Sequence, residues 1–308
     1  MSTLAVREVT QAVISNEIVN QFTKFLDVRP LTIRSYSSGL KMFAKYLHST
    51  KIENPTRDNI LAFKKELEAL GRKPSTIALY IAALRRFFSW TEQAGFYPNI
   101  AVGIKSPKLS KGHKKDCFSA PQIKSILKGI DRSNREGMRN YAIMALMATG
   151  GLRTIEISRA KIEDLRTVGG VPVLYIQGKG RTERTEFVKI TSQVEEAIRQ
   201  YLKMRGKVDA TEALFASESK RNKGECLTTR SISGICKSAM NLAGFNSKQL
   251  TAHSLRHTAV TLALMNGQSL EEVQHFARHL SVNTTLIYSH AVNRMKSQCE
   301  NVIANLIF

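Results

Sequence analysis

The stretch TAHSLRHTAVTLALMNGQSLEEVQHFARHLSVNTTLIYSH, residues 251–290, decides how this chain is interpreted. It contains five of the seven histidines of the chain, two of its arginines and one tyrosine. Its pattern is helical, and Ser269 with Glu272 predicts a capping box that begins a second helix after a turn at Gly267. Three kinds of site fit this composition: a metal site, a DNA-reading helix-turn-helix and a metal-free phosphoryl-transfer site.

A metal site would use histidines that share one face of a helix. His253 and His257 are four residues apart, as are His275 and His279, so each pair meets this condition. A zinc-protease helix also needs a glutamate directly after its first histidine, and neither pair has one. Spacing fixes no cysteine or third ligand either. We therefore expect no metal site, and we interpret His257, His275 and His290 as structural.

A helix-turn-helix would place the second of the two helices in the major groove of DNA. Two helices joined at a glycine-containing turn in a basic chain are compatible with this arrangement. A reading helix, however, favours Arg, Asn and Gln on its exposed face. The segment SLEEVQHFARHL, residues 269–280, instead has two glutamates near its start, which DNA phosphates would repel. This alternative is therefore disfavoured.

The third kind of site accounts for more of these residues. Metal-free cleavage of a phosphodiester needs a nucleophile, cations that stabilise the added negative charge and a proton donor for the leaving oxygen. His253 and Arg256 are three residues apart on one helix face, so their side chains can converge on one phosphate. Arginine suits this role because its planar guanidinium binds two phosphate oxygens and keeps its charge.

The charge of the chain favours a polyanionic partner. The 308 residues include 46 Lys and Arg against 25 Asp and Glu, a net charge of +21, and residues before and after 110 both carry a basic excess. The alternative is that this charge only keeps the protein soluble.

The four cysteines are scattered without a CxxC pair, as is typical of reduced cysteines. With no signal-peptide core and no membrane-spanning run, we expect a cytoplasmic protein without membrane contact.

The first hundred residues predict a small helical bundle. Four segments space their apolar residues three and four apart, as helices do: 16–26, 31–50, 56–70 and 73–96. Thr56 and Ser75 are the predicted N-caps of the third and fourth helices. In the fourth helix an aromatic cluster is interpreted as core. The neighbouring Arg85 and Arg86 are either solvated residues or phosphate contacts.

The segment AVGIKSPKLSKGHKKD, residues 101–116, interrupts the helical periodicity and is interpreted as a basic linker. Such a linker between two basic domains could cross a DNA backbone. Its five lysines are the candidate contacts: Lys105, Lys108, Lys111, Lys114 and Lys115. The predicted organisation is an N-terminal helical domain over residues 1–100, the linker over 101–116 and a second domain over 117–308.

The second domain mixes helices with a small sheet. A helix capped by Ser119 is followed by a buried helix that ends at Gly150 and Gly151. Two strand-like runs, 171–177 and 185–191, are joined by the polar turn GKGRTER and predict a β-hairpin. The fold class is therefore mainly α with a small β-hairpin or sheet.

The motifs HSLRHT and RHLSVNTTLIYSH resemble the C-terminal signature of the tyrosine recombinase (phage integrase) family, in its simple two-domain form. The family's first arginine follows a helix in a TGLR context, and ATGGLRTIEIS supplies it, with Glu156 as an orienting carboxylate. Its lysine lies on a hairpin turn, which YIQGKGRTERTEFVKI supplies. The resemblance covers roughly residues 15–300 and implies six catalytic residues: Arg153, Lys179, His253, Arg256, His279 and Tyr288.

The resemblance implies a helical core-DNA-binding domain followed by a mixed α/β catalytic domain, which together recombine double-stranded DNA at specific sites. Tyr288 would attack a scissile phosphate and give a 3′-phosphotyrosyl link with a free 5′-hydroxyl. Arg153 and Arg256 would stabilise the negative charge added to the phosphate. No cofactor, ATP or metal would be required, because the covalent link conserves the energy of the broken bond.

The remaining catalytic positions would move protons and bind the phosphate. The resemblance implies Lys179 as the acid toward the leaving 5′-oxygen, His253 as the proton acceptor for the tyrosine and His279 as a hydrogen-bond partner of the phosphate. One departure lies near this site, because the family usually has glycine before its second histidine and this chain has Arg278. Arg278 is therefore a candidate DNA contact.

The resemblance also implies partners. The DNA would carry paired inverted half-sites, and strand exchange would proceed through a Holliday junction in a homotetramer, with accessory proteins as a further class of partner. Residues 291–308 predict one amphipathic helix that either folds back on its own domain or docks on a neighbouring subunit. The alternative activities are that of a type IB topoisomerase and that of a non-catalytic DNA-binding regulator.

Overall fold

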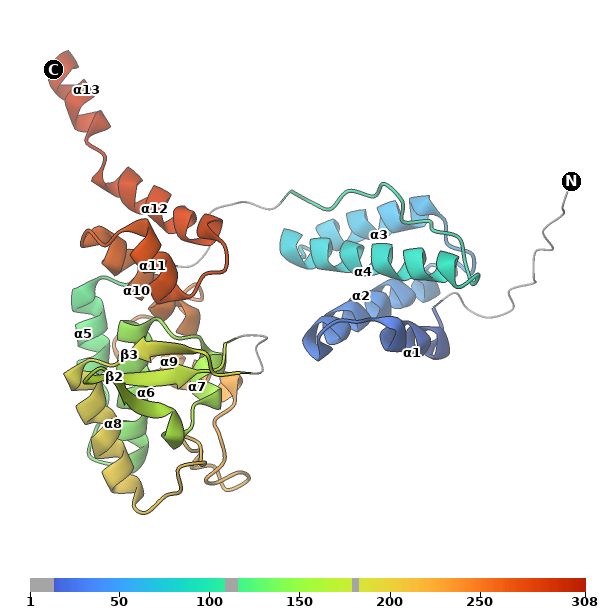
Figure 1. The fold of residues 1–308 in the computed structure, drawn as a ribbon. Helices are drawn as coiled ribbons and strands as arrows, with labels where there is room; N and C mark the ends of the chain where they lie inside the picture. The colour runs from blue at the N-terminus through green and yellow to red at the C-terminus, as the bar shows by residue number, and fades with distance from the viewer. Residues whose placement is uncertain (1–13, 109–115, 179–182) are drawn as a thin grey trace, which may run out of the picture. The chain divides into compact units, whose positions relative to one another are not determined.

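The computed structural model describes residues 14–108, 116–178 and 183–308. The chain divides into two compact units, residues 1–110 and 111–308, and each unit is described by itself (Figure 1). Both units consist mainly of helices, and the second contains one small sheet. The predicted fold class is therefore confirmed.

The N-terminal unit is built from the four predicted helices. They are α1 (Asn16–Phe25), α2 (Pro30–Ser49), α3 (Arg57–Ala69) and α4 (Pro74–Gln93). The two long helices, α2 and α4, pack against each other along much of their length (Figure 1). The predicted aromatic cluster of α4 lies in the core, where Phe87 and Phe88 are fully buried.

The helix starts of this unit test two predicted caps. Thr56 is the N-cap of α3, and its backbone N–H donates to the Asn59 side chain at 2.7 Å. The prediction that Ser75 caps α4 is wrong, because this helix begins at Pro74, two residues earlier than such a cap would place it, with Lys73 as its N-cap. Proline suits the first position of a helix because its φ is already helical and its missing N–H would have had no partner there.

The N-terminal unit extends beyond its predicted end at residue 100. Ala101 and Ile104 are buried in the same hydrophobic core as the four helices. The linker predicted from residue 101 is therefore wrong over its first residues, where two apolar side chains among the lysines attach the chain to the bundle. Lys105 and Lys108 follow and are exposed.

The second unit begins with helices α5 (Ala120–Lys128), α6 (Arg135–Gly150) and α7 (Thr154–Arg159). Ser119 caps α5 as predicted, since its hydroxyl accepts from the Gln122 N–H at 3.4 Å. Helix α6 is buried along most of its length and forms the centre of the largest hydrophobic core. It therefore supports the chain segment that follows its C-terminal end.

The sheet contains the predicted hairpin and one further strand. Strands β2 (Val171–Ile176) and β3 (Glu186–Lys189) pair antiparallel, and β1 (Leu165–Val168) pairs with the other edge of β2, after a short 3-10 turn, η1 (Ile162–Asp164). The turn of the hairpin, residues 179–182, lies outside the described residues. Helices α8 (Ser192–Arg205) and α9 (Thr229–Leu242) follow the sheet.

The histidine-rich stretch, residues 251–290, lies in three helices, α10 (Ala252–Met265), α11 (Leu270–Ala277) and α12 (Val282–Lys296), the last of which continues beyond it. The capping box of Ser269 and Glu272 is confirmed at the start of α11. These helices share a separate small core, which includes residues from all three. It consists of Val260, Leu264, Val273, Ala277, Tyr288 and Val292.

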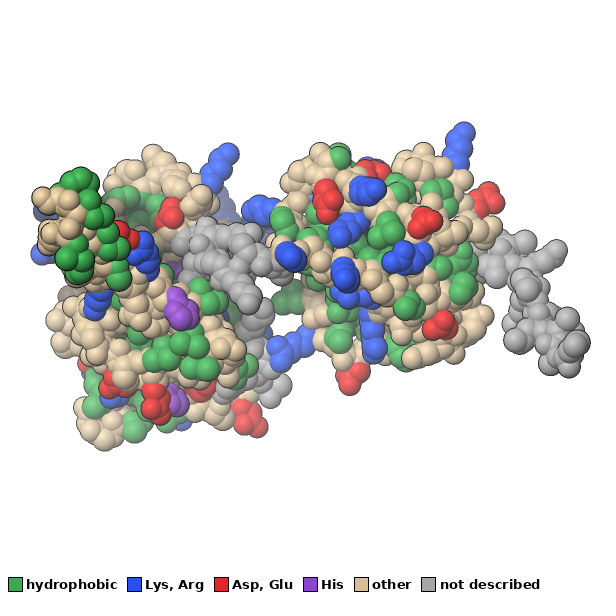
Figure 2. All heavy atoms as spheres, turned by 90° about the horizontal axis from the view of Figure 1, so that it is seen from above, with side chains coloured by type: hydrophobic (Ala, Val, Ile, Leu, Met, Phe, Trp, Pro, Cys, Tyr) green, Lys and Arg blue, Asp and Glu red, His purple; other side chains and the backbone are tan. Residues whose placement is uncertain are grey.

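The end of the chain differs from the single helix predicted over residues 291–308. Helix α12 continues to Lys296, Ser297 is extended (φ −62°, ψ 134°), and a second helix, α13 (Cys299–Ile307), follows. Val292 packs into the core of its own unit, whereas no residue of α13 is buried. Figure 1 shows α13 leading away from α12, and in Figure 2 its hydrophobic side chains form a patch on the face viewed from above.

Two further sequence features can be compared with the structure. All four cysteines are free thiols, and three of them are exposed. Over the residues that the structure describes, no helix combines the length and the apolar composition needed to cross a membrane.

Candidate active site

Arg153 lies at the sharp turn between α6 and α7. Helix α6 ends with Gly151 in the left-handed conformation (φ 57°, ψ 33°), and Arg153 is the extended residue from which α7 begins. A β-carbon at Gly151 would approach the Phe276 ring of α11 to 3.2 Å, so glycine meets both a conformational and a packing requirement. The turn carries Arg153 out of the buried helix and toward the neighbouring carboxylate.

Glu156, the orienting carboxylate that the resemblance implies, contacts Arg153. It is fully buried, and its Oε1 accepts from Arg153 Nη1 at 2.8 Å while its Oε2 accepts from the Arg153 backbone N–H at 2.8 Å. Arg278 Nη2 also donates to Oε2, at 3.2 Å. Burial raises the pKa of Glu156, but the charges of Arg278 and Arg153 and the backbone bond outweigh it, so the net shift is downward. The carboxylate therefore stays ionised.

Arg256 is held from the other side by backbone carbonyls. It lies on α10, is 1% exposed, and donates from Nη1 to the Gly151 carbonyl at 2.5 Å and from Nη2 to the Ala277 carbonyl. Burial, followed by repulsion from Arg153 and Arg278, lowers the pKa of Arg256. This accumulation of positive charge is unfavourable by itself and suits a site that receives an anion.

Tyr288 lies on α12 beside these arginines and is 4% exposed. Its hydroxyl forms a hydrogen bond with His257 Nδ1, and its ring stacks on His279 with centroids 6.0 Å apart. Burial raises the pKa of Tyr288 to about 12, although Arg256 and Arg153 oppose the shift. The hydroxyl is therefore protonated at neutral pH and needs a proton acceptor before it can act as a nucleophile.

The histidines of the stretch fall into three groups. His279 is buried, and its Nδ1 forms a hydrogen bond with Thr285 Oγ1 at 2.9 Å. His253 is exposed on α10, with its ring edge-on to that of His257 at 4.5 Å. His275 and His290 are exposed. The contact of His257 with the tyrosine hydroxyl was not predicted, and its only sequence signal is its place one turn after His253 and directly after Arg256.

The predicted lysine, Lys179, lies outside the described residues. The hairpin that would carry it is described up to Gly178 and again from residue 183, and the strand ends Ile176 and Glu186 are paired. The assignment of Lys179 therefore stays a prediction.

The predicted DNA contacts differ in exposure. Arg85 and Arg86 are both exposed on α4, where Arg85 donates to Ser106 Oγ at 2.7 Å and Arg86 lies over the Phe25 ring at 5.7 Å. Lys105 is exposed as well, whereas the guanidinium of Arg278 is turned inward and its side chain is 6% exposed. Three candidates lie outside the described residues: Lys111, Lys114 and Lys115.

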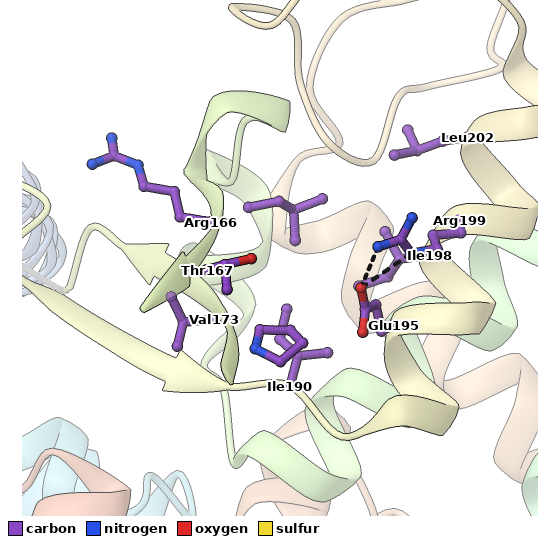
Figure 3. A pocket seen from close by; sticks show the side chains of 10 residues that line it. Arg166, Thr167, Val173, Ile190, Glu195, Ile198, Arg199 and Leu202 are labelled. Carbon is purple, nitrogen blue, oxygen red and sulfur yellow. Dashed lines mark hydrogen bonds and ion pairs between the residues drawn. The ribbon is translucent and has the colours of Figure 1, made fainter. Parts of the chain in front are cut away.

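A pocket of about 350 Å³ lies between the strands β1 and β2 and helix α8 (Figure 3). Its walls are mostly aliphatic, and the Arg199–Glu195 ion pair lies on its α8 side. It contains none of the predicted catalytic residues and is not part of the candidate site. Within the described ranges, no three or more His, Cys, Asp or Glu side chains gather as metal ligands would.

The sequence of the chain matches two protein-family descriptions. Residues 117–294 match "Phage integrase family", and residues 19–95 match "Phage integrase, N-terminal SAM-like domain". The first match alone covers more than half of the chain, and its range includes all six predicted catalytic positions. The chain belongs to the phage integrase family.

Curated relatives are similar over most of the chain. "Tyrosine recombinase XerD" of Listeria monocytogenes is 29% identical over 289 residues, which cover 89% of this chain and 94% of the relative. "Tyrosine recombinase XerC" of Pelobacter propionicus is 28% identical over 270 residues, which cover 86% of each chain.

Solved structures share the fold. A XerH site-specific recombinase bound to its palindromic difH substrate, in a post-cleavage complex, is similar with a TM-score of 0.75 at 21% identity, covering 94% of this chain and 85% of that one. A lambda integrase tetramer bound to a Holliday junction has a TM-score of 0.67 at 19% identity, covering 88% and 76% of the two chains. The folds of the helical unit and of the catalytic unit with its small sheet therefore also occur in known recombinases.

Proposed function

We propose that this chain is a site-specific DNA recombinase that cuts and rejoins double-stranded DNA through a covalent 3′-phosphotyrosyl intermediate. Its family and its relatives named tyrosine recombinases support this function. The observation that carries it for this chain is that Arg153, Arg256 and Tyr288 meet in one site. Both arginines form hydrogen bonds with residues 151–156. Tyr288 lies close enough for the positive charges of both arginines to act on the pKa of its hydroxyl.

In the first step, Tyr288 Oη forms a bond to the scissile phosphorus, and the bond from phosphorus to the 5′-oxygen breaks. Arg153 and Arg256 bind the non-bridging oxygens and stabilise the negative charge of the transition state. His279, held by Thr285, donates a hydrogen bond to the phosphate. The reverse step, with a 5′-hydroxyl of the partner strand as nucleophile, rejoins the DNA and frees the tyrosine.

Two protons must move in this step. His253 accepts the proton of the tyrosine hydroxyl, and Lys179 supplies a proton to the leaving 5′-oxygen. In the structure the tyrosine hydroxyl forms a hydrogen bond with His257 instead. We propose that Tyr288 leaves this bond when it turns toward the phosphate and comes within reach of His253, whose ring already contacts that of His257.

The reaction uses neither a metal ion nor ATP. The guanidinium groups supply the positive charge that a metal would otherwise provide, and the phosphotyrosyl link conserves the energy needed for rejoining. No cofactor is therefore expected, and the proposed location is the cytoplasm.

We further propose that the DNA carries paired inverted half-sites and that four copies of the chain exchange strands through a Holliday junction, with accessory proteins in some settings. The exposed apolar side chains of α13 dock on a neighbouring copy. Arg85 and Arg86 follow the DNA backbone, and so do the five lysines of the predicted linker: Lys105, Lys108, Lys111, Lys114 and Lys115.

A covalent trap tests the function directly. A nicked duplex, carrying a site selected by binding from a randomised library, loses a short strand once it is cut, so the enzyme stays attached. The native protein is expected to give a protein–DNA band that survives denaturation, in EDTA as in magnesium. Tyr288→Phe is the matched control, because it removes one oxygen and should bind the same DNA without forming the band.

The other outcomes separate the alternatives. A band that Tyr288→Phe also forms would remove Tyr288 as the nucleophile, and loss of the band in EDTA with recovery in a divalent ion would restore a metal mechanism. Binding without any band would favour a non-catalytic regulator. Relaxation of supercoiled DNA without exchange between two duplexes would favour an activity like that of a type IB topoisomerase.

A further inference from the structure

Arg278 occupies a position that favours glycine. It ends α11 in the left-handed conformation (φ 54°, ψ 47°), and Lys51 is the one other non-glycine residue with positive φ among those the structure describes. A β-carbon in this conformation crowds the backbone, which is why glycine is usual at such helix ends. The side chain of Arg278 is therefore kept at a steric cost, and its contacts indicate why.

The guanidinium of Arg278 is directed into the protein, with 6% of the side chain exposed. Its Nη1 donates to the Phe276 carbonyl at 2.7 Å. Its Nη2 donates to Glu156 Oε2 at 3.2 Å and to the Gly151 carbonyl at 3.2 Å. The side chain thus connects the end of α11 to the turn between α6 and α7.

Both acceptors of Nη2 also hold the arginines of the candidate site. The Glu156 carboxylate accepts from the side chain and the backbone N–H of Arg153, each at 2.8 Å. The Gly151 carbonyl accepts from Arg256 Nη1 at 2.5 Å. One guanidinium therefore contacts the support of Arg153 and the support of Arg256 at once.

We propose that Arg278 is a positioning residue: it fixes the Glu156 carboxylate and the Gly151 carbonyl so that Arg153 and Arg256 present a preformed phosphate site. This inference rests on the proposed function, in which both arginines bind the scissile phosphate. Arg278 itself does not contact the DNA. Its positive charge adds to the field of the site, while Glu156 neutralises part of the accumulated charge and keeps the three guanidinium groups together.

Arg278→Gly is the variant that tests this role. Glycine accepts the left-handed backbone, so the substitution removes the guanidinium without adding strain. We expect the affinity for a half-site duplex and its dependence on salt to stay as in the native protein. Single-turnover cleavage of the nicked duplex should fall about 10- to 100-fold, the size of effect expected when reacting groups shift by about 1 Å.

The matched control is Arg199→Ala. Arg199 also pairs with a glutamate, Glu195 at 2.5 Å, but it lies on α8 and 71% of its side chain is exposed. Its loss removes the same charge and the same kind of ion pair without touching the site, so cleavage should be unchanged. An equal fall in both variants would overturn the inference, because net charge alone would then explain the effect.

A double substitution separates positioning from a general loss of structure. Because Arg278 shares the Glu156 carboxylate with Arg153 and also contacts the Gly151 carbonyl, Arg278→Gly combined with Glu156→Gln should slow cleavage by less than the product of the two single effects. Losses that multiply would overturn the inference. Should Arg278→Gly fail to fold, Arg278→Lys replaces it, because lysine keeps the charge but lacks the planar fork that spans both acceptors. Native cleavage by that variant would also overturn the inference.

The salt dependence distinguishes the remaining possibility, that Arg278 turns outward and binds a phosphate. The loss of one phosphate contact lowers the slope of log affinity against log salt by about one. A lower slope for Arg278→Gly would replace the positioning role with a direct contact. If the native protein binds the duplex but forms no covalent adduct, the proposed function fails, and this outcome is distinct from all of those above.

Discussion

Helix α13 begins only eleven residues after Tyr288, yet their surroundings are opposite. Tyr288 is 4% exposed and contacts His257 and His279 of its own unit. Helix α13 buries none of its residues, and its apolar side chains Val302, Ile303 and Leu306 are more than half exposed. The short extended segment at Ser297 divides the two environments.

This difference indicates which property each region controls. The site around Tyr288 is assembled within one chain, so substitutions there should change the rate of cleavage and the stability of that chain. The apolar side chains of α13 are of a kind that monomeric proteins rarely leave exposed together. Removal of α13 should therefore change how copies of the chain combine on DNA and should leave the fold of each copy intact.

The largest expected effect is the loss of an arginine from the site. Arg153→Ala and Arg256→Ala should each slow single-turnover cleavage by on the order of 10²-fold or more, since each removes a charge that stabilises the transition state. Arg256→Ala should also lower the free energy of unfolding by about 1–3 kcal/mol, because the buried Ala277 carbonyl loses the Arg256 donor and the Gly151 carbonyl keeps only Arg278.

Arg153 provides the contrast within this pair. Its side chain is 27% exposed, and Glu156 keeps the backbone N–H of residue 153 and Arg278 as donors, so Arg153→Ala should reduce cleavage with less effect on stability. Urea unfolding and nicked-duplex cleavage, measured on the same preparations, check both statements. Equal free energies of unfolding for the two variants would mean that the buried hydrogen bonds of Arg256 do not stabilise the fold.

A smaller effect distinguishes the two histidines near the tyrosine. His253→Ala should slow cleavage by about 10²-fold, the lower end for the loss of a general base. His257→Ala should slow it by about 10-fold or less if His257 only holds the hydroxyl in the DNA-free protein. Single-turnover rates decide the order, and a larger loss for His257→Ala would transfer the role of proton acceptor to His257.

Removal of α13 should leave the site intact. Truncation after Ser297 keeps α12 whole, including Val292 in its core. Affinity for a single half-site and thermal stability should be nearly unchanged, whereas cooperative binding to the paired site should fall about 10-fold or more and strand exchange should be impaired. One gel-shift titration measures affinity and cooperativity together. Unchanged cooperativity would refute docking on a neighbouring copy.

Much of this fold could be predicted because local signals agree with the final structure. The capping box of Ser269 and Glu272, the glycine at the end of α6 and the polar turn between β2 and β3 each act over a few residues. Strand β1 escaped prediction because it has four residues, most of them exposed, and therefore shows no alternation of apolar and polar side chains. Helix α9 was not predicted either, although its Thr228 N-cap is a clear local signal.

The contacts of the site were harder to predict because they join distant segments. The bond between Tyr288 and His257 spans 31 residues and depends on how α12 packs on α10. The inward direction of Arg278 depends on acceptors more than 120 residues earlier in the chain. Motif spacing identifies which residue types meet, and the packing of helices decides which nitrogen faces which oxygen.

The smallest expected effect concerns the ionisation of Tyr288. Burial raises its pKa to about 12, above the ordinary value of about 10 for tyrosine. The folded protein therefore holds this proton more tightly than the unfolded chain does. The resulting contribution to stability is complete below pH of about 10 and is lost as the pH rises toward 12, because the unfolded chain releases the proton first.

Urea unfolding of the native protein and of Tyr288→Phe at a pH of about 9 and a pH of about 11 measures this contribution. Between these two conditions the native protein should lose on the order of 1 kcal/mol more than the Phe variant, which has no proton to release. Removal of α13 should not change this difference, since no residue of that helix is buried against the tyrosine. If the native protein and the Phe variant showed the same pH dependence, the tyrosine would ionise as freely as in the unfolded chain. Tyr288 would then differ from helix α13 in its burial but not in its effect on the pH dependence of stability.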